Sequence, residues 1–343
     1  MRAVLKYVTM PAAVGIALLL GALGPEEARA AVGEKDKVTC MYPVWVGFGP
    51  VNLANELGYF EEEGITVEEV LDDDMPNGVA AMERGDIDCY LRTIGEYQGL
   101  GRTKETQGTI IGTIDISTGG DGWAADASIK SVCDLKGKTI AVEPNLPARL
   151  IIQNALKSEC GLSIKDTNLS DAAAADAIGI FADPNVAAVG TYEPVLSQVV
   201  STHQDRGAHI VASSRDYDDL IMDVIFVHTD ELKANPDKYV KFLRAVYRAV
   251  DYFNKNQEQA IPIIAEHFSI TPEDFKATLP NFRYTPFEEA LQLIGTEDQE
   301  GRAYEVFRET MDLNLEFGSS ETKLNPEDHI DRSIINKVEK NWE

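Results

Sequence analysis

The chain has 343 residues, of which 44% are hydrophobic and 26% charged, with 57 acidic side chains against 31 basic ones. This length allows one large domain or two, and the 26 Gly and 15 Pro residues are too few for a disordered or collagen-like chain. A formal net charge of −26 argues against nucleic acids and anionic membrane surfaces as partners, because such polyanions attract Lys and Arg.

The first thirty residues have the pattern of a secretory signal peptide. Arg2 and Lys6 form a short basic segment, residues 12–23 are apolar, and Ala28 and Ala30 place small side chains where a signal peptidase reads them. The apolar stretch is short for a membrane span, and a retained N-terminal membrane helix is the alternative. We therefore expect cleavage after Ala30 and export of the remaining chain.

Export makes the four cysteines, Cys40, Cys89, Cys133 and Cys160, candidates for disulfide bonds. They form no CxxC pair and have no His at zinc-finger spacing, so we expect no structural metal. Buried free thiols are the alternative, and these residues alone leave the pairing open.

Strand-like and helix-like segments alternate along the chain, which is typical of an α/β protein with parallel sheets. The expected strands span residues 37–46, 66–71, 87–91, 109–116, 139–142, 186–192, 209–212 and 223–227. The expected helices span residues 51–60, 77–84, 147–160 and 171–181, and beyond residue 230 the chain should be almost entirely helical.

The alternation restarts near Gly119, so we expect two α/β units in tandem followed by a helical tail. Two such units form two lobes, and ligands of open α/β sheets bind beyond the carboxyl ends of the strands. The sequence therefore predicts a ligand cleft between the lobes.

Common motifs for nucleotide binding and hydrolysis are missing: the sequence has no P-loop, no GxGxxG after a strand, no HExxH and no GxSxG. The glycine-rich segment 119–122 lacks a Lys and is interpreted as a turn. The acidic run 72–74 could hold a hard cation, but three adjacent carboxylates are more typical of a solvated turn. The five His residues are scattered, so we expect neither a metal site nor a cofactor.

Five stretches, in the same order, resemble one family. The segment ANELGYFEEEGI (54–65) resembles the opening of the substrate-binding proteins of nitrate, sulfonate and taurine ABC transporters. The further stretches are GDID (85–88), SVCDLKGK (131–138), YEP (192–194), and NP (235–236) followed by FLRA (242–245). The family also contains intracellular relatives that make or process thiamin pyrimidine precursors, but the cysteine-rich motif of the pyrimidine synthases is missing here.

The resemblance implies a type II periplasmic binding protein fold with two α/β lobes, a ligand cleft and a helical C-terminal tail. Residues 31–118 would begin lobe one, residues 119–218 would form lobe two, and residues 219–343 would return to lobe one and form the tail. The crossings near residues 117–123 and 213–223 would act as a hinge.

The same layout implies a disulfide between Cys133 and Cys160, because Cys133 would precede a strand and Cys160 would end the next helix, both on the face away from the cleft. Cys40 and Cys89 would lie on neighbouring parallel strands, where we expect a bridge to be awkward.

Residues just past the strand ends should face the cleft, and they fall into three chemical classes. Aromatic rings could stack on an organic ligand or hold a cation, carboxylates could bind an ammonium, and arginines could clamp an acidic group. The candidate ligand-binding residues are Trp45, Phe48, Arg92, Asp115, Ser117, Thr118, Trp123, Asn145, Arg149, Tyr192, Glu193 and Asp223.

Each class has a structural alternative. The rings could pack in the core, the strand-end aspartates could cap helices or hold the hinge, and Arg92 could pair with Asp88 or Glu96. Glu193 lies at the family's (W/Y)(D/E)P position, which resembles a ligand-contacting site of the taurine and sulfonate binders.

Three carboxylates around a bare inorganic anion would repel it, so we expect a small nitrogen-bearing organic ligand, such as a taurine-like zwitterion or a pyrimidine-like compound. The predicted function is a monomeric periplasmic solute-binding protein that delivers this ligand to an ABC permease and catalyses no reaction. The alternatives are a binder of an inorganic anion such as nitrate, an enzyme acting on a thiamin-pyrimidine or menaquinone precursor, and a ligand-sensing domain.

Overall fold

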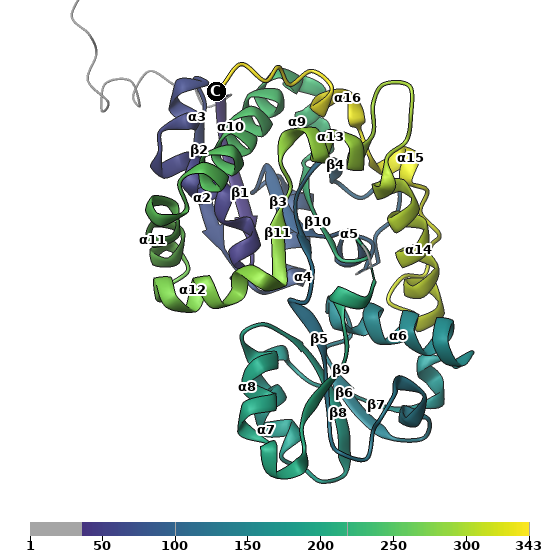
Figure 1. Ribbon diagram of the computed structural model, residues 1–343. Helices are drawn as coiled ribbons and strands as arrows, with labels where there is room; N and C mark the ends of the chain where they lie inside the picture. Colours follow the sequence, from purple (N-terminus) through teal and green to yellow (C-terminus); the bar gives the residue numbers. More distant parts are fainter. Residues whose placement is uncertain (1–35, 100, 218, 343) are drawn as a thin grey trace, which may run out of the picture.

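The structure, a computed structural model, describes residues 36–99, 101–217 and 219–342. It has two lobes, each built on one β-sheet flanked by helices (Figure 1). The predicted signal peptide, residues 1–30, lies outside the described residues. Within the described ranges, no helix combines the length and the apolar character needed to cross a membrane.

Lobe one contains a six-stranded sheet with the strand order β11-β4-β10-β3-β1-β2. β1 pairs in parallel with β2 and β3, whereas β10 runs antiparallel to β3 and β4, and β11 runs antiparallel to β4. The strands are β1 (Lys37–Tyr42), β2 (Thr66–Leu71), β3 (Cys89–Thr93), β4 (Thr109–Ser117), β10 (Met222–Val227) and β11 (Phe282–Tyr284).

Lobe two contains a five-stranded sheet with the order β7-β6-β8-β5-β9. β6 pairs in parallel with β7 and β8, and β5 runs antiparallel to β8 and β9. The strands are β5 (Asp121–Ala125), β6 (Thr139–Val142), β7 (Asn168–Asp171), β8 (Val186–Tyr192) and β9 (His209–Ser213).

Both sheets are therefore mixed, and the expectation of parallel sheets was wrong. The cause is the chain path between the lobes. β4 leads directly into β5, and β9 leads into β10, so each incoming strand enters its new sheet from the opposite end and pairs antiparallel. Antiparallel pairing needs no crossover helix, which is why two short connections suffice.

The helices that cover the sheets are α2 (Gly49–Glu56), α3 (Tyr59–Glu62), α4 (Met75–Arg84), α5 (Ile94–Tyr97), α6 (Pro147–Cys160), α7 (Ala177–Phe181), α8 (Val195–Thr202), α9 (Thr229–Ala234), α10 (Pro236–Lys255), α11 (Gln257–His267), α12 (Pro272–Thr278), α13 (Phe287–Ile294), α14 (Arg302–Phe317), α15 (Pro326–His329) and α16 (Arg332–Ile335). The predicted helix 51–60 is divided in two at Gly58, whose φ of 73° is left-handed. The predicted helix 171–181 is shorter, because Asp171 pairs with Val142 as the end of β7.

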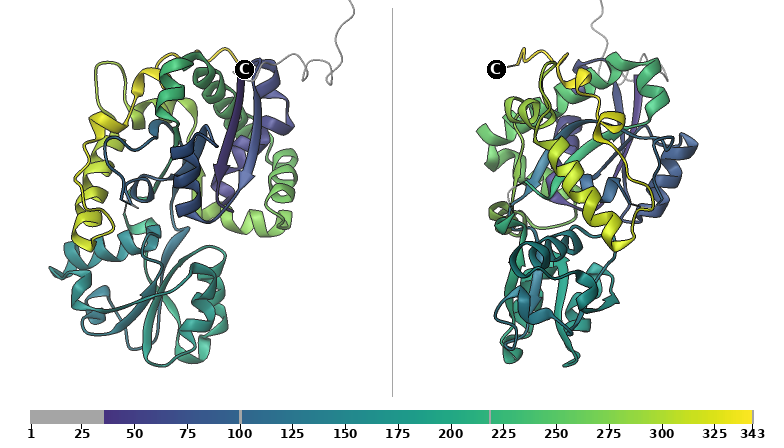
Figure 2. Two further views of the ribbon diagram at one scale, coloured as in Figure 1. Left: turned by 180° about the vertical axis from the view of Figure 1, so that it is seen from behind. Right: turned by 90° about the vertical axis from the view of Figure 1, so that its right-hand side faces the viewer.

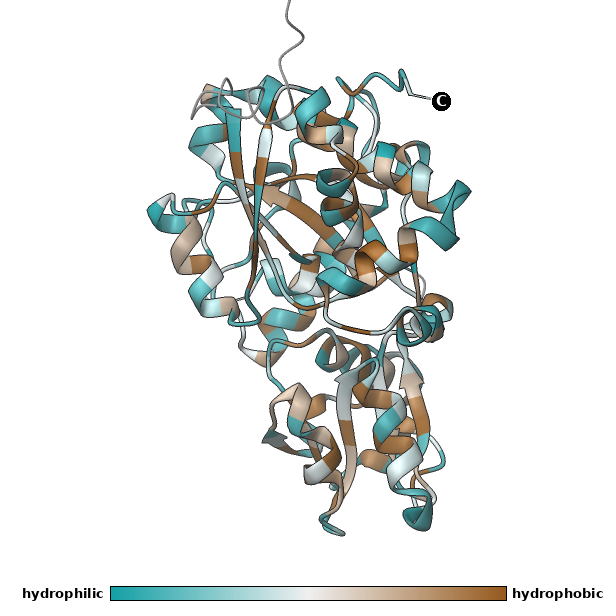
Figure 3. Cartoon of the chain, turned by 90° about the vertical axis from the view of Figure 1, so that its left-hand side faces the viewer, coloured by the Kyte–Doolittle hydropathy of each residue, from teal (hydrophilic) through white to brown (hydrophobic). Residues whose placement is uncertain are grey.

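Apolar side chains concentrate on the strands and on the helix faces that cover them (Figure 3). In lobe one, α10 buries Phe242, Val246 and Val250 against the sheet and its neighbouring helices. Lobe two has its own core, and the tail contributes to it: Leu313 lies in that core and Phe317 packs against it. The tail helix α14 thus extends along lobe one to reach α6 of lobe two (Figures 1 and 2).

Two disulfides are present among the described residues. Cys133 and Cys160 are bridged, as predicted, with their Cα atoms 5.6 Å apart. Cys40 and Cys89 are bridged as well, although a bridge between neighbouring parallel strands was expected to be awkward. They are direct register partners on β1 and β3, with a Cα–Cα separation of 4.3 Å, and this close approach permits the bond.

We predict that Gly190→Ala destabilises lobe two by about 1–3 kcal/mol, because over-packing a buried sheet costs free energy. A Cβ on Gly190 would lie 2.7 Å from the ring of Trp123 and 2.9 Å from the side chain of Val142. Gly179→Ala is the matched control, since no atom lies within 4 Å of its Cβ and α7 should gain up to about 1 kcal/mol from Ala. Urea unfolding measures the stability of both variants. Equal stabilities would contradict the prediction.

Candidate functional site

A pocket of about 730 Å³, open to solvent, lies between the facing ends of the two sheets. The residues that line it are Pro43, Val44, Trp45, Phe48, Asp73, Met75, Arg92, Thr93, Glu96, Asp121, Glu143, Asn145, Leu146, Pro147, Ala174, Tyr192 and Asp223.

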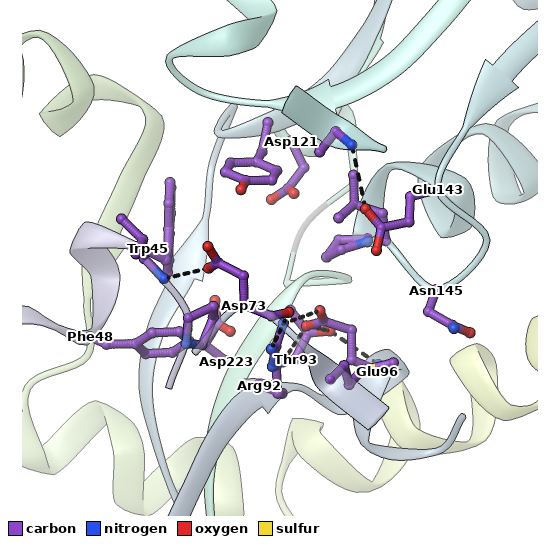
Figure 4. A pocket seen from close by; sticks show the side chains of 17 residues that line it. Trp45, Phe48, Asp73, Arg92, Thr93, Glu96, Asp121, Glu143, Asn145 and Asp223 are labelled. Atoms are coloured by element: carbon purple, nitrogen blue, oxygen red, sulfur yellow. Dashed lines mark hydrogen bonds and ion pairs between the residues drawn. The ribbon is translucent and has the colours of Figure 1, made fainter. Parts of the chain in front are cut away.

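Strand ends position most of these side chains. On the lobe-two side, Asp121 begins β5, Glu143 directly follows β6, and Tyr192 ends β8. On the lobe-one side, Thr93 ends β3 and Asp223 lies in the second position of β10. Figure 4 shows Asp121 and Glu143 facing Trp45, Asp73, Glu96 and Asp223 across the open space. The pocket is therefore built from both lobes.

The pocket is strongly acidic. Its wall carries five carboxylates, Asp73, Glu96, Asp121, Glu143 and Asp223, and among the described residues that line it Arg92 is the single cation. Asp73 and Glu143 are exposed at the mouth, whereas Asp121 and Asp223 are buried. Within the described ranges, no three His, Cys, Asp or Glu side chains are arranged to hold a metal ion.

The guanidinium of Arg92 is bound by neighbouring groups of the protein. Its Nε donates to the hydroxyl of Tyr90 at 3.0 Å, and its guanidinium forms an ion pair with Glu96 at 3.3 Å. A further N–H donates to the carbonyl oxygen of Asp73 at 3.0 Å. The predicted alternative of pairing with Glu96 is thus what the structure shows, and Arg92 has little left to offer an anionic ligand.

Asp115 and Asp223 lie opposite each other at the edge of the pocket, where Asp223 lines the wall and Asp115 lies behind it. They are register partners on β4 and β10, with exposed fractions of 0% and 4%. The indole Nε1–H of Trp45 donates to Oδ2 of Asp115 at 2.9 Å, and the carboxyl group of Asp223 lies close enough to influence the ionisation of Asp115. Burial raises the pKa of Asp115 to about 6, and burial together with Asp115 raises the pKa of Asp223 well above its usual range.

Asp121 adds a third buried carboxyl group, with 6% of its surface exposed. Burial raises its pKa to about 7; the hydroxyl of Ser117 acts to lower this pKa, and the neighbouring Glu96, Asp115 and Glu193 act to raise it. The ligand-free pocket consequently retains protons near neutral pH, which limits its negative charge.

Aromatic surface adjoins these acids. Trp45, Phe48 and Tyr192 contribute rings to the pocket wall. Burial and the nearby carboxylates of Asp73 and Glu143 raise the pKa of the Tyr192 hydroxyl to about 12, so this side chain is neutral. Aromatic faces beside excess carboxylate are suited to an organic cation.

Six of the twelve predicted ligand contacts line the pocket: Trp45, Phe48, Arg92, Asn145, Tyr192 and Asp223. Asp115 lies directly behind the wall, where it contacts Trp45. Ser117 and Thr118 hold the chain crossing instead. The hydroxyl of Ser117 hydrogen-bonds to that of Ser214 at 2.8 Å, and the amide of Thr118 donates to the carbonyl oxygen of Asn281 at 2.8 Å.

Trp123 and Glu193 also lie outside the pocket wall. Trp123 is completely buried under α6, where its Nε1–H donates to the carbonyl oxygen of Ala148 at 2.6 Å. Glu193 accepts hydrogen bonds from the amide and the hydroxyl of Ser197, in the first turn of α8. The orientation of these two side chains does not follow from their position along the chain, because neighbouring helices decide which face of a strand end is covered.

Arg149 was predicted to clamp an acidic ligand group, but it is 99% buried between α6 and α14 and does not line the pocket. Its guanidinium donates to the carbonyl oxygen of Pro144, to Oε1 of Gln153 and to Oδ1 of Asn314, at 2.8, 2.8 and 2.5 Å. Burial lowers its pKa to about 9. Arg149 therefore joins lobe two to the tail of lobe one.

Four acidic residues of the wall were not among the candidates predicted from the sequence. Asp73 and Glu143 follow predicted strands within two residues, so the strand-end rule could have found them. Glu96 accepts from the backbone and hydroxyl of Thr93 as part of a capping box, a signal for a helix start rather than for a site. Asp121 was assigned to a glycine-rich turn, whereas it begins β5.

Comparisons with known proteins agree with this architecture. The profile of the family described as NMT1/THI5 like matches residues 45–260, more than half of the sequence, so the chain belongs to that family. A candidate binding protein of Brucella abortus is 22% identical over 278 residues, which cover 81% of this chain and 84% of the relative.

Two solved structures illustrate the shared fold. The periplasmic aliphatic sulphonate binding protein SsuA from Escherichia coli has a TM-score of 0.68 and 17% identity, covering 86% of this chain and 92% of its own. The periplasmic nitrate-binding protein NrtA from Synechocystis PCC 6803 has a TM-score of 0.67 and 15% identity, covering 89% of this chain and 86% of its own. These likenesses confirm the predicted type II periplasmic binding protein fold.

We predict that Arg149→Met lowers the free energy of unfolding by about 2–4 kcal/mol, because it leaves several buried acceptors without a donor. Arg84→Met is the matched control: Arg84 is exposed and its 2.7 Å ion pair with Asp86 should be worth less than about 1 kcal/mol. Chemical unfolding measures both values, and equal losses would refute the proposed role of Arg149 in joining the lobes.

We also predict that Asp121→Asn stabilises the ligand-free protein at pH 8 but not at pH 4. The folded-state pKa of about 7 exceeds the usual value of about 3.9, so the stability contributed by protonated Asp121 is present at low pH and is lost as the pH rises through 7. The free energy of unfolding of the variant, relative to wild type, should therefore grow by roughly 1 kcal/mol per pH unit between about pH 4 and pH 7.

Unfolding curves measured from pH 4 to pH 8 test this prediction. The exposed Asp298, replaced by Asn, removes the same charge and serves as the control. A stability difference between wild type and Asp121→Asn that stays constant with pH would show that Asp121 is ionised throughout.

Proposed function

We propose that this member of the NMT1/THI5-like family is an exported solute-binding protein, which captures a small nitrogen-bearing organic molecule and delivers it to an ABC importer. The fold and the solute-binding relatives support the general role. In this proposal the processed protein works as a periplasmic monomer, and it releases its ligand unchanged.

We infer the ligand class from the excess of carboxylates that both lobes place around a pocket with aromatic walls. The one lining arginine is already paired with Glu96, so a sulfonate or nitrate would meet uncompensated negative charge. A cation would instead be attracted from both sides of the pocket. Among the expected ligands, this favours cationic compounds, including protonated pyrimidine-like bases, over taurine-like zwitterions.

The two chain crossings support a closing motion. Gly119 has a φ of 133°, and its amide donates to the hydroxyl of Ser214 at 2.7 Å, so the crossings are short and held side by side. Rotation about them would bring Asp121 and Glu143 toward the lobe-one wall. A ligand that contacts both walls would stabilise the closed state, which the membrane permease would then recognise.

A thermal-shift screen tests the proposed ligand class. The purified protein is mixed with choline, ethanolamine, putrescine, thiamin pyrimidine precursors, taurine, alkanesulfonates and nitrate. A compound at about one hundred times its Kd should add about 2.7 kcal/mol, which raises the Tm by a few degrees. We expect nitrogenous cations to give the shifts, whereas shifts with nitrate or sulfonates alone would contradict the proposal, and turnover of a bound compound would indicate an enzyme.

We predict that Glu143→Gln weakens binding of such a cation by about threefold to tenfold, or up to about 1.4 kcal/mol, because it removes one charge at the mouth of the pocket. Glu258→Gln removes an equal charge on the exposed surface of α11, outside the pocket wall, and should leave the affinity unchanged. Calorimetric titration of both variants measures the effect, and equal affinities would show that Glu143 does not face the ligand.

A further inference from the structure

The Asp115 and Asp223 pair is enclosed on every side except the pocket. A Cβ on Gly47 would lie 1.7 Å from Oδ2 of Asp115, so the backbone of the neighbouring turn already fills that side. The indole of Trp45 covers the same oxygen. Asp223 lines the pocket, so a ligand or solvent molecule reaches the pair only past Asp223.

No cation contacts this pair within the described part of the chain. Arg283 of β11 acts to lower the pKa of Asp115 from a distance, and that guanidinium is held by ion pairs with Asp219 and Glu289. Oδ1 of Asp115 is buried and receives no hydrogen bond from an N–H group or a hydroxyl. A proton on Asp223 is the donor that this oxygen requires, because two buried carboxylates in contact cannot both be ionised at low cost.

The remaining charged and titratable groups reinforce this state. Glu96 of α5 and Asp121 of β5 add negative charge near the pair, and Tyr284 of β11 is a neutral phenol, its pKa raised by burial and by Asp115. Trp45 supplies a single neutral N–H. The pair therefore carries one shared proton and one negative charge when the pocket holds no ligand.

We propose that the ligand is an organic cation whose positively charged nitrogen takes the place of the proton shared by Asp115 and Asp223, so that capture releases one proton. This inference rests on the proposed function and specifies its ligand class: an ammonium, amidinium or quaternary ammonium compound without an acidic group near the nitrogen.

The exchange conserves charge at the buried site. Before binding, two carboxyl groups and one proton carry a net charge of −1. After binding, two carboxylates and one monovalent cation also carry −1, and the proton passes to the buffer. The O–H bond of Asp223 breaks, and the cation keeps all its own bonds. Without ligand, the protein thus avoids a second buried carboxylate that has no partner. With ligand bound, it avoids an excess of buried positive charge.

The aromatic part of the pocket wall also supports this assignment. Trp45 contacts Asp115 and also lines the pocket, so its ring adjoins the position that the cation would take. A cation beside an aromatic face gains a further attraction that a proton does not. This attraction allows a cation to compete with a proton for the same carboxylates.

The first test uses the ligand-free protein. Infrared spectra at pH 7 should contain the carbonyl stretch of a protonated carboxylic acid, and this band should weaken in Asp223→Asn. Asn is isosteric with Asp and can donate an N–H to Asp115, so the variant should stay folded, which circular dichroism verifies. Asp298→Asn should leave the band unchanged. A band that is missing from wild type, or that is unaffected by Asp223→Asn, would overturn the shared proton.

The second test measures proton release by titration calorimetry with choline, ethanolamine and putrescine, in buffers of different ionisation enthalpy at pH 7. Choline has no N–H, so any proton released in its titration comes from the protein. We expect close to one proton released, and an affinity that falls up to tenfold per pH unit as the pH is lowered. Asp223→Asn should lose the proton release and at least tenfold in affinity, whereas Asp121→Asn should retain the release.

The outcomes separate the two proposals. Binding of a cation without proton release overturns the displacement step but leaves the proposed function standing. Proton release that disappears in Asp121→Asn and persists in Asp223→Asn moves the proton to Asp121 and overturns the assignment to the pair. If none of the three cations binds, the displacement step fails, and a response to nitrate or sulfonates alone then refutes the proposed function as well.

Discussion

An excess of buried carboxylate is the constraint around which the site is organised. Asp115, Asp121 and Asp223 converge where two sheets meet, and the nearby arginines are occupied by other carboxylates. Desolvated carboxylates without cations hold protons, as the raised pKa values of all three show. The ligand-free pocket is therefore acidic in composition but only partly charged.

One buried polar cluster connects the two walls of this pocket. Asn314 of α14 accepts from Arg149 of lobe two and donates to Gly95 and Gln98, on and beside the short helix α5 of lobe one. α5 carries Glu96, and the start of α6 carries Pro147, both of which line the pocket. The C-terminal tail thus links two walls that are far apart in the sequence.

The likeness to the sulphonate-binding and nitrate-binding structures is one of architecture. Identities of 15–17% with the sulphonate-binding and nitrate-binding structures leave the strand-end residues free to differ while the sheets and crossings are kept. In such a fold the ligand is chosen by the few side chains at the strand ends. Here those side chains are mainly acids and aromatic rings, and the basic one is neutralised by an internal ion pair.

Local signals in the sequence were enough to predict much of the secondary structure and half of the expected site. Strands 66–71, 139–142 and 186–192 and helix 147–160 have the bounds predicted from alternation, capping and glycine positions. The strand-end rule located residues such as Trp45 and Tyr192, because it depends only on where strands stop. The antiparallel entry of the crossing strands, the burial of Trp123 and the inter-lobe position of Arg149 were decided by tertiary structure alone. These features depend on which elements pack together, and packing partners distant along the chain leave no local pattern in the sequence.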